Sequence, residues 1–388
     1  MPKLMRITTV PLALRYLLQG QMLFMKNNGF DVLMVSADGQ GREAVMKNED
    51  CPHVIVPMTR SITPIADLKC LWQLIKLIKK EKPDIIHTHT PKAGLLGMMA
   101  AKYCGVKIRI HTIAGLRFVT STGPTKRILI SMEKITCAAA NHVWPNSNSM
   151  LRSVKEYKLS KPSKLEVIAH GSSNGIDLER FSPEKLTGQA LQLVKDQLKY
   201  DPQLRYLLFV GRIVKDKGVE ELLEAFDGLY KNDSALRLVL VGSFENKLDP
   251  ISEKAATLLH EHPGIIHIPW SDLVEYFMSL AYLLVHPSHR EGFPNVLLQA
   301  GAMNCPIVCS QIDGNIDVVV HEQTGLLFKT GDPQDLQKKL SEAIAQPEKM
   351  KEQAIILNGI IHNNFDQKIV HRKILERYRE LMAENVAK

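Results

Sequence analysis

Residues 206–230 read YLLFVGRIVKDKGVEELLEAFDGLY, and the class of fold follows from their pattern. An apolar run at 206–210 leads into a turn at 211–218, and from residue 219 onward the apolar residues recur at helical spacing. A short apolar strand joined to an amphipathic helix is the repeating unit of parallel sheets that are covered by helices. The stretch therefore predicts one strand, one tight turn and one helix of such a sheet.

The same alternation extends over the whole chain, in two series. Strands of the first series are expected at residues 6–10, 31–36, 54–57, 84–88, 107–112, 143–145 and 165–168. Strands of the second series are expected at residues 206–210, 237–241, 265–268, 282–286 and 307–310. Helices are expected between them, among others at residues 66–80, 92–104, 219–230 and 296–303. Because 388 residues exceed what one hydrophobic core organises, we predict an α/β protein of two doubly wound, Rossmann-like domains facing a cleft.

The boundary between the domains is expected at residues 170–177, which read HGSSNGID and interrupt the alternation. Gly, Ser and Asn clusters of this kind form loops. We assign residues 1–172 to an N-terminal domain and residues 173–366 to a C-terminal domain. The amphipathic segment that follows, residues 367–388, has no strand after it, and we expect it to pack back on the first domain as a closing helix.

The turn at 211–218 carries two cations beside a glycine. Gly211 lets the backbone turn directly after the strand, Arg212 can fork onto two phosphate oxygens, and Lys217 adds a point charge at the helix start. Ligands of parallel sheets bind at this carboxyl end of the strands. The chemistry predicts a diphosphate ligand, and a basic helix start on a solvated surface is the alternative.

A second turn, residues 288–295 with the sequence SHREGFPN, again lies between a predicted strand and a predicted helix. Gly292 permits close approach of a ligand to the backbone, and Pro294 suits a helix start. Free N–H groups around Asn295 can hold an anion or sugar hydroxyls, and Glu291 can accept hydrogen bonds from hydroxyls. A solvated loop glutamate is the alternative.

Both turns, in this order and about 80 residues apart, resemble those of retaining glycosyltransferases of family 4, which have the GT-B fold. The resemblance spans nearly the whole chain and implies that the C-terminal domain binds a nucleotide-sugar donor. The resemblance also implies that Arg212, Lys217 and Glu291 are catalytic residues. It implies a donor site formed by Gly211, Arg212, Lys217, Glu291, Gly292, Phe293, Pro294, Asn295 and Gln299.

Position 299 departs from the family pattern, which has a second glutamate eight residues after the first. In the family this glutamate generally holds the ribose hydroxyls of the nucleotide. Gln299 retains the hydrogen bonds but loses the charge assistance of a carboxylate.

The N-terminal domain resembles the acceptor domain of the same family. Residues 84–94, DIIHTHTPKAG, are similar to the histidine-containing strand end of members that build bacterial surface polysaccharides, which places His89 and Lys92 on the acceptor side. His111 matches an active-site histidine that contacts the transferred sugar, and a buried structural histidine is the alternative. The hinge residues 174–177, NGID, resemble the Asn-Gly-Val-Asp segment that joins the two domains of the family.

Metals and organic cofactors are not expected. No DxD sequence occurs, so Arg212 and Lys217 take the place of the metal that other glycosyltransferases hold on the diphosphate. His87 and His89 share one side of a strand, but no further ligand cluster accompanies them. Residues 39–44, GQGREA, match a dinucleotide fingerprint on the wrong strand and without the following acidic residue, which argues against a nicotinamide enzyme.

Charge is distributed unevenly along the chain. The first 170 residues hold 25 Lys and Arg against 11 Asp and Glu, whereas the remainder holds 24 against 30. An N-terminal domain that faces an anionic membrane surface is one interpretation, and lysine-rich solvated helix faces are the other. Nucleic acid is the weakest alternative, because no binding module is recognisable.

The expected location is the cytoplasm, either free or peripheral on the inner face of the cytoplasmic membrane. No apolar run approaches the roughly 18 residues of a membrane span, and no signal-peptide pattern opens the chain. The six cysteines lack CxxC spacing, which is typical of buried, reduced thiols.

We therefore predict a retaining hexosyltransferase that moves a sugar from a nucleotide-diphosphate donor, preferably a UDP-sugar, to an acceptor hydroxyl. The charge of the first half favours a polyprenyl-diphosphate-linked glycan of surface polysaccharide synthesis as the acceptor, and a soluble acceptor is the alternative. Three alternatives remain open: a sugar phosphorylase of the same fold, a nucleotide-sugar epimerase, and an inactive nucleotide-sugar binding protein.

Overall fold

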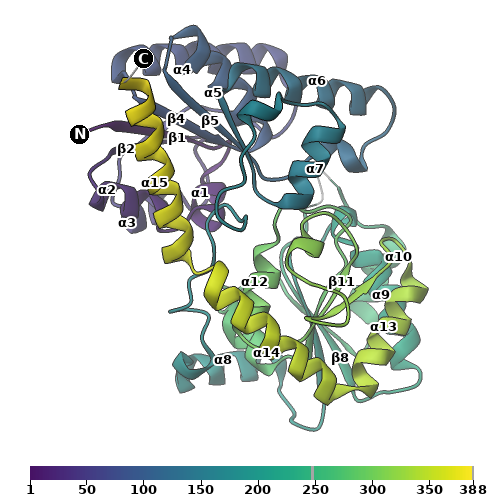
Figure 1. The fold of residues 1–388 in the computed structure, drawn as a ribbon. Helices are drawn as coiled ribbons and strands as arrows, with labels where there is room; N and C mark the ends of the chain where they lie inside the picture. Colours follow the sequence, from purple (N-terminus) through teal and green to yellow (C-terminus); the bar gives the residue numbers. More distant parts are fainter. Residues whose placement is uncertain (246–248, 387–388) are drawn as a thin grey trace. The chain divides into compact units, whose positions relative to one another are not determined.

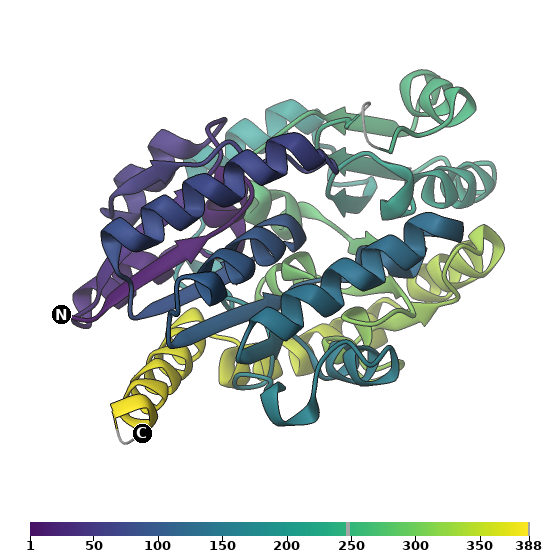
Figure 2. The same ribbon diagram turned by 90° about the horizontal axis from the view of Figure 1, so that it is seen from above.

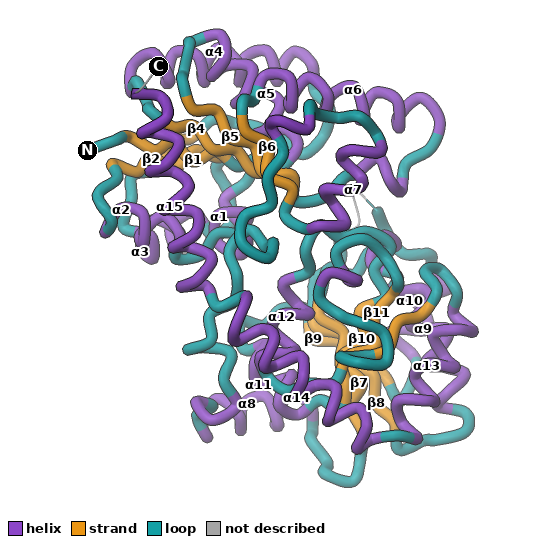
Figure 3. The backbone as a smooth tube through the Cα atoms, in the orientation of Figure 1, coloured by secondary structure: helices purple, strands orange, loops and turns teal. Residues whose placement is uncertain are grey.

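The computed structural model describes residues 1–245 and 249–386. The chain forms two compact units: unit 1 contains Met1–Gly175 and Gln367–Lys388, and unit 2 contains Ile176–Asp366. Each unit has one six-stranded parallel sheet between layers of helices (Figures 1 and 3). The predicted α/β class with two doubly wound sheets is confirmed.

The sheet of unit 1 has the strand order β3-β2-β1-β4-β5-β6. Its strands are β1 (Lys3–Ile7), β2 (Asp31–Ser36), β3 (His53–Ile55), β4 (Ile85–His89), β5 (Ile108–Ile113) and β6 (His142–Pro145). The strand order reverses between β1 and β4, and such a switch point is where open α/β sheets bind ligands.

The sheet of unit 2 has the order β12-β11-β10-β7-β8-β9, which reverses between β7 and β10. Its strands are β7 (Arg205–Val210), β8 (Leu236–Val241), β9 (Ile265–Ile268), β10 (Leu283–His286), β11 (Ile307–Ser310) and β12 (Leu326–Phe328). The three-residue edge strand β12 was not predicted. The strand predicted at 165–168 is wrong, because this segment joins the sheet of unit 1 through one isolated bridge, between Val143 and Leu165.

Helices cover both faces of the sheet in unit 1 (Figure 1), and Figure 2 shows the helices of one of these faces in front of the strands. One layer consists of α4 (Pro64–Glu81), α5 (Pro91–Tyr103), α6 (Gly123–Ala139) and α7 (Asn148–Glu156). The other consists of α1 (Pro11–Leu17), α2 (Gln21–Asn27), α3 (Arg42–Glu49) and α15 (Gln367–Val386). Alternate residues of β1, β2, β4, β5 and β6 enter the two cores, as burial of a parallel sheet on both faces requires.

Unit 2 is covered in the same way. One layer contains α9 (Val219–Tyr230), α10 (Glu253–Glu261) and α13 (Pro333–Ala345). The other contains α8 (Gly188–Leu198), α11 (Val274–Leu280), α12 (Asn295–Ala302) and α14 (Pro347–Asn364).

The C-terminal helix α15 lies on unit 1 (Figure 1, yellow). Its apolar side packs into the core formed with β1, β2, β4 and β5 through Val370, Ile374, Leu375, Tyr378 and Leu381. Within residues 1–245 and 249–386, no helix combines the length and the apolar character that crossing a membrane requires.

Candidate functional site

The two turns singled out in the sequence meet in unit 2. They follow β7 and β10, which are hydrogen-bonded neighbours at the switch point of the sheet. The Lys217 ammonium forms an ion pair with the Glu291 carboxylate, and both side chains are about five-sixths buried, with 16% and 15% exposed. Glu291 Oε1 also lies 3.1 Å from Nε2 of His286, the last residue of β10. The sheet thus brings Lys217 and Glu291 into one buried cluster.

Glycine is required where the first turn touches the second. Gly218 has φ +67°, and a Cβ atom there would lie 2.1 Å from the carbonyl oxygen of Pro287. Any side chain would force the turn after β7 away from the segment after β10. Gly218 therefore allows Lys217 to reach Glu291.

The charge state of Glu291 follows from its neighbours. Burial by itself would raise the pKa of the carboxyl group, but the Lys217 charge and the His286 hydrogen bond outweigh it and hold the pKa well below its usual range. Glu291 is therefore ionised at neutral pH. It can accept hydrogen bonds from hydroxyl groups, and it cannot act as a proton donor.

Arg212 lies at the same edge of the sheet but outside this cluster. It is about half exposed and forms an ion pair with Glu245, which follows β8. The turn before it is tight, because a Cβ atom on Gly242 would lie 1.7 Å from the carbonyl oxygen of Gly211. A phosphate group bound by Arg212 would compete with the Glu245 carboxylate.

The start of α12 forms another part of the site. Gly292, Phe293 and Pro294 are buried, and the Phe293 ring packs against Phe365 at 5.3 Å between centroids. Asn295 is the first residue of the helix. Gln299, one turn later, is half-buried, and within the described residues its side-chain amide makes no hydrogen bond. The amide is therefore available to a ligand.

Two contacts of this site were not predicted. His286 binds Glu291, and the Arg290 guanidinium binds the Asp216 carboxylate at 2.6 Å, which ties the two turns together. A sequence signal existed for His286, because it is the one polar residue at the end of the apolar strand LLVH.

His111, predicted to contact the transferred sugar, is buried inside unit 1. Its Nδ1 atom lies 2.8 Å from Oγ1 of Thr88. A Cβ atom on Gly94 of α5 would lie 2.3 Å from the imidazole ring, so the ring occupies the space that this glycine leaves. Burial lowers the pKa of His111 to about 4, so the ring is neutral at pH 7. These contacts are those of a core residue, and the catalytic role stays a prediction.

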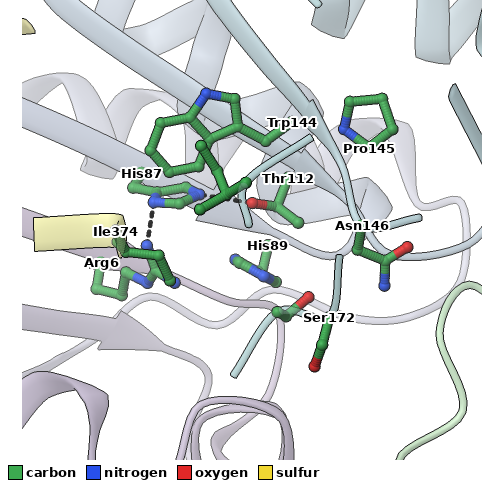
Figure 4. A pocket seen from close by; sticks show the side chains of 11 residues that line it. Arg6, His87, His89, Thr112, Trp144, Pro145, Asn146, Ser172 and Ile374 are labelled. Carbon is green, nitrogen blue, oxygen red and sulfur yellow. Dashed lines mark hydrogen bonds between the residues drawn. The ribbon is translucent and has the colours of Figure 1, made fainter. Parts of the chain in front are cut away.

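Lys92 and His89, predicted on the acceptor side, differ in their surroundings. Lys92 is buried and forms an ion pair with Asp67 at 2.6 Å, which joins α5 to the start of α4. His89 is also buried, and in the part of the chain that the structure describes both of its ring nitrogens lack a hydrogen-bond partner. It lines a pocket of unit 1 (Figure 4).

Comparison with known proteins assigns the family. Residues 192–356 match the family described as Glycosyl transferases group 1, and residues 23–180 match Glycosyltransferase Family 4. The capsular polysaccharide biosynthesis glycosyltransferase CapM of Staphylococcus aureus is 34% identical over 377 residues, 96% of each chain. The UDP-Gal:alpha-D-GlcNAc-diphosphoundecaprenol alpha-1,3-galactosyltransferase of Escherichia coli is 26% identical over 314 residues, 79% of this chain and 78% of its own.

The chain therefore belongs to the group 1 glycosyl transferases, with a Family 4 region in its first half. It is an enzyme that transfers a sugar, as the resemblance of the two turns to family 4 implied. The crystal structure of Anabaena Alr3699/HepE in complex with UDP and glucose has the same fold, with a TM-score of 0.79 at 16% identity over 98% of this chain and 100% of the other. The predicted GT-B fold is confirmed.

Proposed function

We propose that this enzyme transfers a hexosyl residue, with retention at the anomeric carbon, from a UDP-sugar to a polyprenyl-diphosphate-linked glycan in surface polysaccharide synthesis. The observation that carries the proposal is the Lys217–Glu291–His286 cluster at the switch point of unit 2. It combines a cation for the diphosphate with an ionised acceptor for sugar hydroxyls. Arg212 supplies a second cation at the same edge of the sheet.

The main chemical problem of the transfer is the charge that develops on the departing diphosphate. Preorganised cations and helix N-termini stabilise such charge, and this is usually the largest catalytic contribution. Lys217 and Arg212 serve as these cations, and Gln299 serves as the ribose ligand. Glu291 orients the sugar. No side chain is assigned as the base, and a donor phosphate oxygen is proposed to take the acceptor proton.

The proposed donor and acceptor classes agree with the name of the Escherichia coli relative, which is a UDP-galactose enzyme acting on a diphosphoundecaprenol-linked sugar. The CapM relative is a capsular polysaccharide enzyme. Retention is what the resemblance to family 4 implies. The product anomer, determined by NMR, tests this part of the proposal.

Peripheral attachment to an anionic membrane is supported by the outer layer of unit 1. Helix α4 exposes Ile65, Leu68 and Trp72 on one side, at 78%, 58% and 56% exposure. Exposed lysines, among them Lys69 and Lys76, lie on the same helix. Apolar side chains that enter the lipid interface beside lysines that meet anionic headgroups are typical of helices that lie on a membrane.

Donor binding is tested by thermal shift with UDP, GDP, ADP and the corresponding nucleotide sugars. UDP is expected to raise the unfolding temperature of the parent, and Arg212→Ala and Lys217→Ala are expected to abolish the shift. Lys215→Ala is the matched control, because Lys215 is an exposed lysine of the same turn. A parent-like response of both site variants would refute the assignment of the donor site.

Transfer is tested by following UDP release and label incorporation into a diphosphoundecaprenol-linked acceptor. A phosphorylase would require orthophosphate, and an epimerase would convert the sugar without acceptor. An inactive binding protein would bind the donor and release no UDP. Activity is expected to persist in excess chelator, because Arg212 and Lys217 replace a metal on the diphosphate.

A further inference from the structure

Arg6 is a cation buried in unit 1. Its side chain is 1% exposed. Nη1 donates to Tyr378 Oη at 2.7 Å and also contacts His87 Nδ1, and Nη2 donates to Gln21 Oε1 at 2.5 Å. Among residues 1–245 and 249–386, no carboxylate pairs with the guanidinium. Buried charges in proteins are normally paired, so the surroundings of Arg6 suit an anion.

The partners of Arg6 are neutral. Burial raises the pKa of Tyr378 to about 12, so its phenol stays protonated. Burial lowers the pKa of His87 well below its usual range, and the neighbouring Arg6 charge lowers it further. The imidazole is therefore uncharged at neutral pH. His87 Nε2 lies 2.7 Å from Thr112 Oγ1, so both of its ring nitrogens are already engaged. None of these groups neutralises the guanidinium.

Other polar groups around Arg6 are also unsatisfied. His89 is 1% exposed, and neither of its ring nitrogens has a hydrogen-bond partner among the described residues; the same holds for Arg6 Nε, Asn146 Oδ1 and Ser173 Oγ. All four residues line the pocket of Figure 4, an open-mouthed cavity of about 20 Å³. Buried polar atoms without partners are rare. Their concentration around one pocket suits it to a polar ligand.

The pocket lies where the sheet is expected to bind ligands. Arg6 of β1 is the register partner of His87 of β4, so the pair sits at the switch point of unit 1. Thr112 and Trp144 come from the carboxyl-terminal parts of β5 and β6. A metal ion does not suit this position, because the Arg6 charge would repel it. An anion does.

We propose that this pocket binds a phosphate oxyanion, with Arg6 as its counter-charge and His89 as a hydrogen-bonding group. On the proposed function, this oxyanion belongs to the diphosphate of the lipid-linked acceptor. Arg6 remains protonated in spite of its burial. The neutral His89 ring has one N–H donor for a phosphate oxygen and one acceptor nitrogen for a hydroxyl or water.

Trp144 supplies a direct readout of binding. It lines the pocket, and its ring stacks on Tyr378 at 5.9 Å. The chain has three tryptophans, so a Trp72→Phe/Trp270→Phe background leaves Trp144 as the sole indole. Its fluorescence is titrated with inorganic phosphate, inorganic diphosphate and a short-chain prenyl diphosphate, with and without saturating UDP to occupy the proposed donor site.

The expected result is a saturable change with diphosphate that UDP does not suppress. Arg6→Met and His89→Leu should each weaken binding at least tenfold. The His89 change loses no hydrogen bond within the protein, so it should fold even where the Arg6 variant does not. Arg109→Met is the matched control, since Arg109 is a partly buried arginine of β5 that bonds to backbone carbonyls away from the pocket, and it should bind as the parent does.

The titrations also distinguish a lipid-linked diphosphate from free phosphate as the source of the oxyanion. They further separate a failure of this site from a failure of the proposed function. Prenyl diphosphate binding at least tenfold tighter than inorganic diphosphate supports the acceptor, and equal binding of inorganic phosphate supports a free-phosphate site. No saturable change with any of the three, or unchanged binding in both pocket variants, would overturn the site. Failure of UDP to bind would instead contradict the proposed donor and leave the Trp144 titration as an independent result.

Discussion

Lys217 and Glu291 form a largely buried ion pair, although 74 residues separate them in the sequence. Removing one partner leaves the other as an uncompensated charge, whereas removing both does not. Lys217→Met should therefore destabilise the protein by about 3 kcal/mol. The Lys217→Met/Glu291→Gln double variant should lose less than the sum of the single changes. Urea unfolding of the four proteins measures this coupling, and additive losses would show that the pair is not coupled.

The same pair predicts that a substitution of Glu291 slows sugar transfer without weakening UDP binding. Glu291→Gln keeps the size of the side chain and frees the Lys217 ammonium for phosphate, so UDP should bind at least as tightly as to the parent. The turnover number should fall about tenfold or more, because hydrogen bonds from sugar hydroxyls to a neutral amide are weaker than those to a carboxylate. Calorimetry with UDP and initial rates of transfer test both statements. Weaker UDP binding with an unchanged rate would contradict them.

The packing of His111 on Gly94 predicts that a side chain added at Gly94 destabilises the protein. Gly94→Ala places a methyl group within 2.3 Å of the imidazole ring, and overpacking of this kind costs about 1–3 kcal/mol. His111→Ala in the same chain should restore part of the lost stability. If His111 contacts the transferred sugar as well, His111→Ala alone should lower the turnover number at donor saturation. Parent-like turnover with reduced stability would limit His111 to packing.

Glu133 of α6 predicts a pH dependence of stability. Burial raises its pKa from 4.5 to about 7 in the folded protein. A group with a raised folded-state pKa contributes stability that is complete below its unfolded pKa and is lost as the pH rises through the folded value. Glu133→Gln should therefore exceed the parent in stability by up to about 3 kcal/mol at pH 8.5 and match it near pH 4.5.

The control for this change is Glu156→Gln, at an exposed glutamate of α7. Thermal unfolding across pH 4.5–8.5 provides the comparison. A Glu133→Gln advantage that does not grow with pH would show that Glu133 is not buried as a neutral acid.

The exposed side of α4 predicts how the enzyme binds membranes. Trp72→Ser and Ile65→Ser should each weaken flotation with vesicles that contain anionic lipid, and raised salt should weaken it further because the lysine contribution is screened. Ile355→Ser is the matched control, because Ile355 is 64% exposed on α14 of unit 2. Absence of vesicle binding at low salt would refute the membrane proposal.

Much of the fold could be predicted from local pattern. The strands at 31–36, 265–268 and 307–310 and the helix at 219–230 have the predicted bounds, because apolar runs and helical periodicity are local properties of the chain. The central strand predicted at residues 6–10 instead spans Lys3–Ile7 as β1, and two further failures lie at sheet edges. Leu165 pairs through a single bridge, and β12 has three residues, so neither pattern is long enough to be diagnostic.

The sequence by itself determined the class of fold and the cationic turn with Arg212 and Lys217, because a strand, a glycine turn and a helix are encoded by neighbouring residues. The tertiary structure alone decided which distant groups meet. It joined Lys217 to Glu291 and His286, and it buried His111 under Gly94. It also placed Arg6 beside Tyr378, 372 residues away. Hydrogen bonding between non-sequential strands and the packing of α15 create these contacts, and no local pattern in the chain records them.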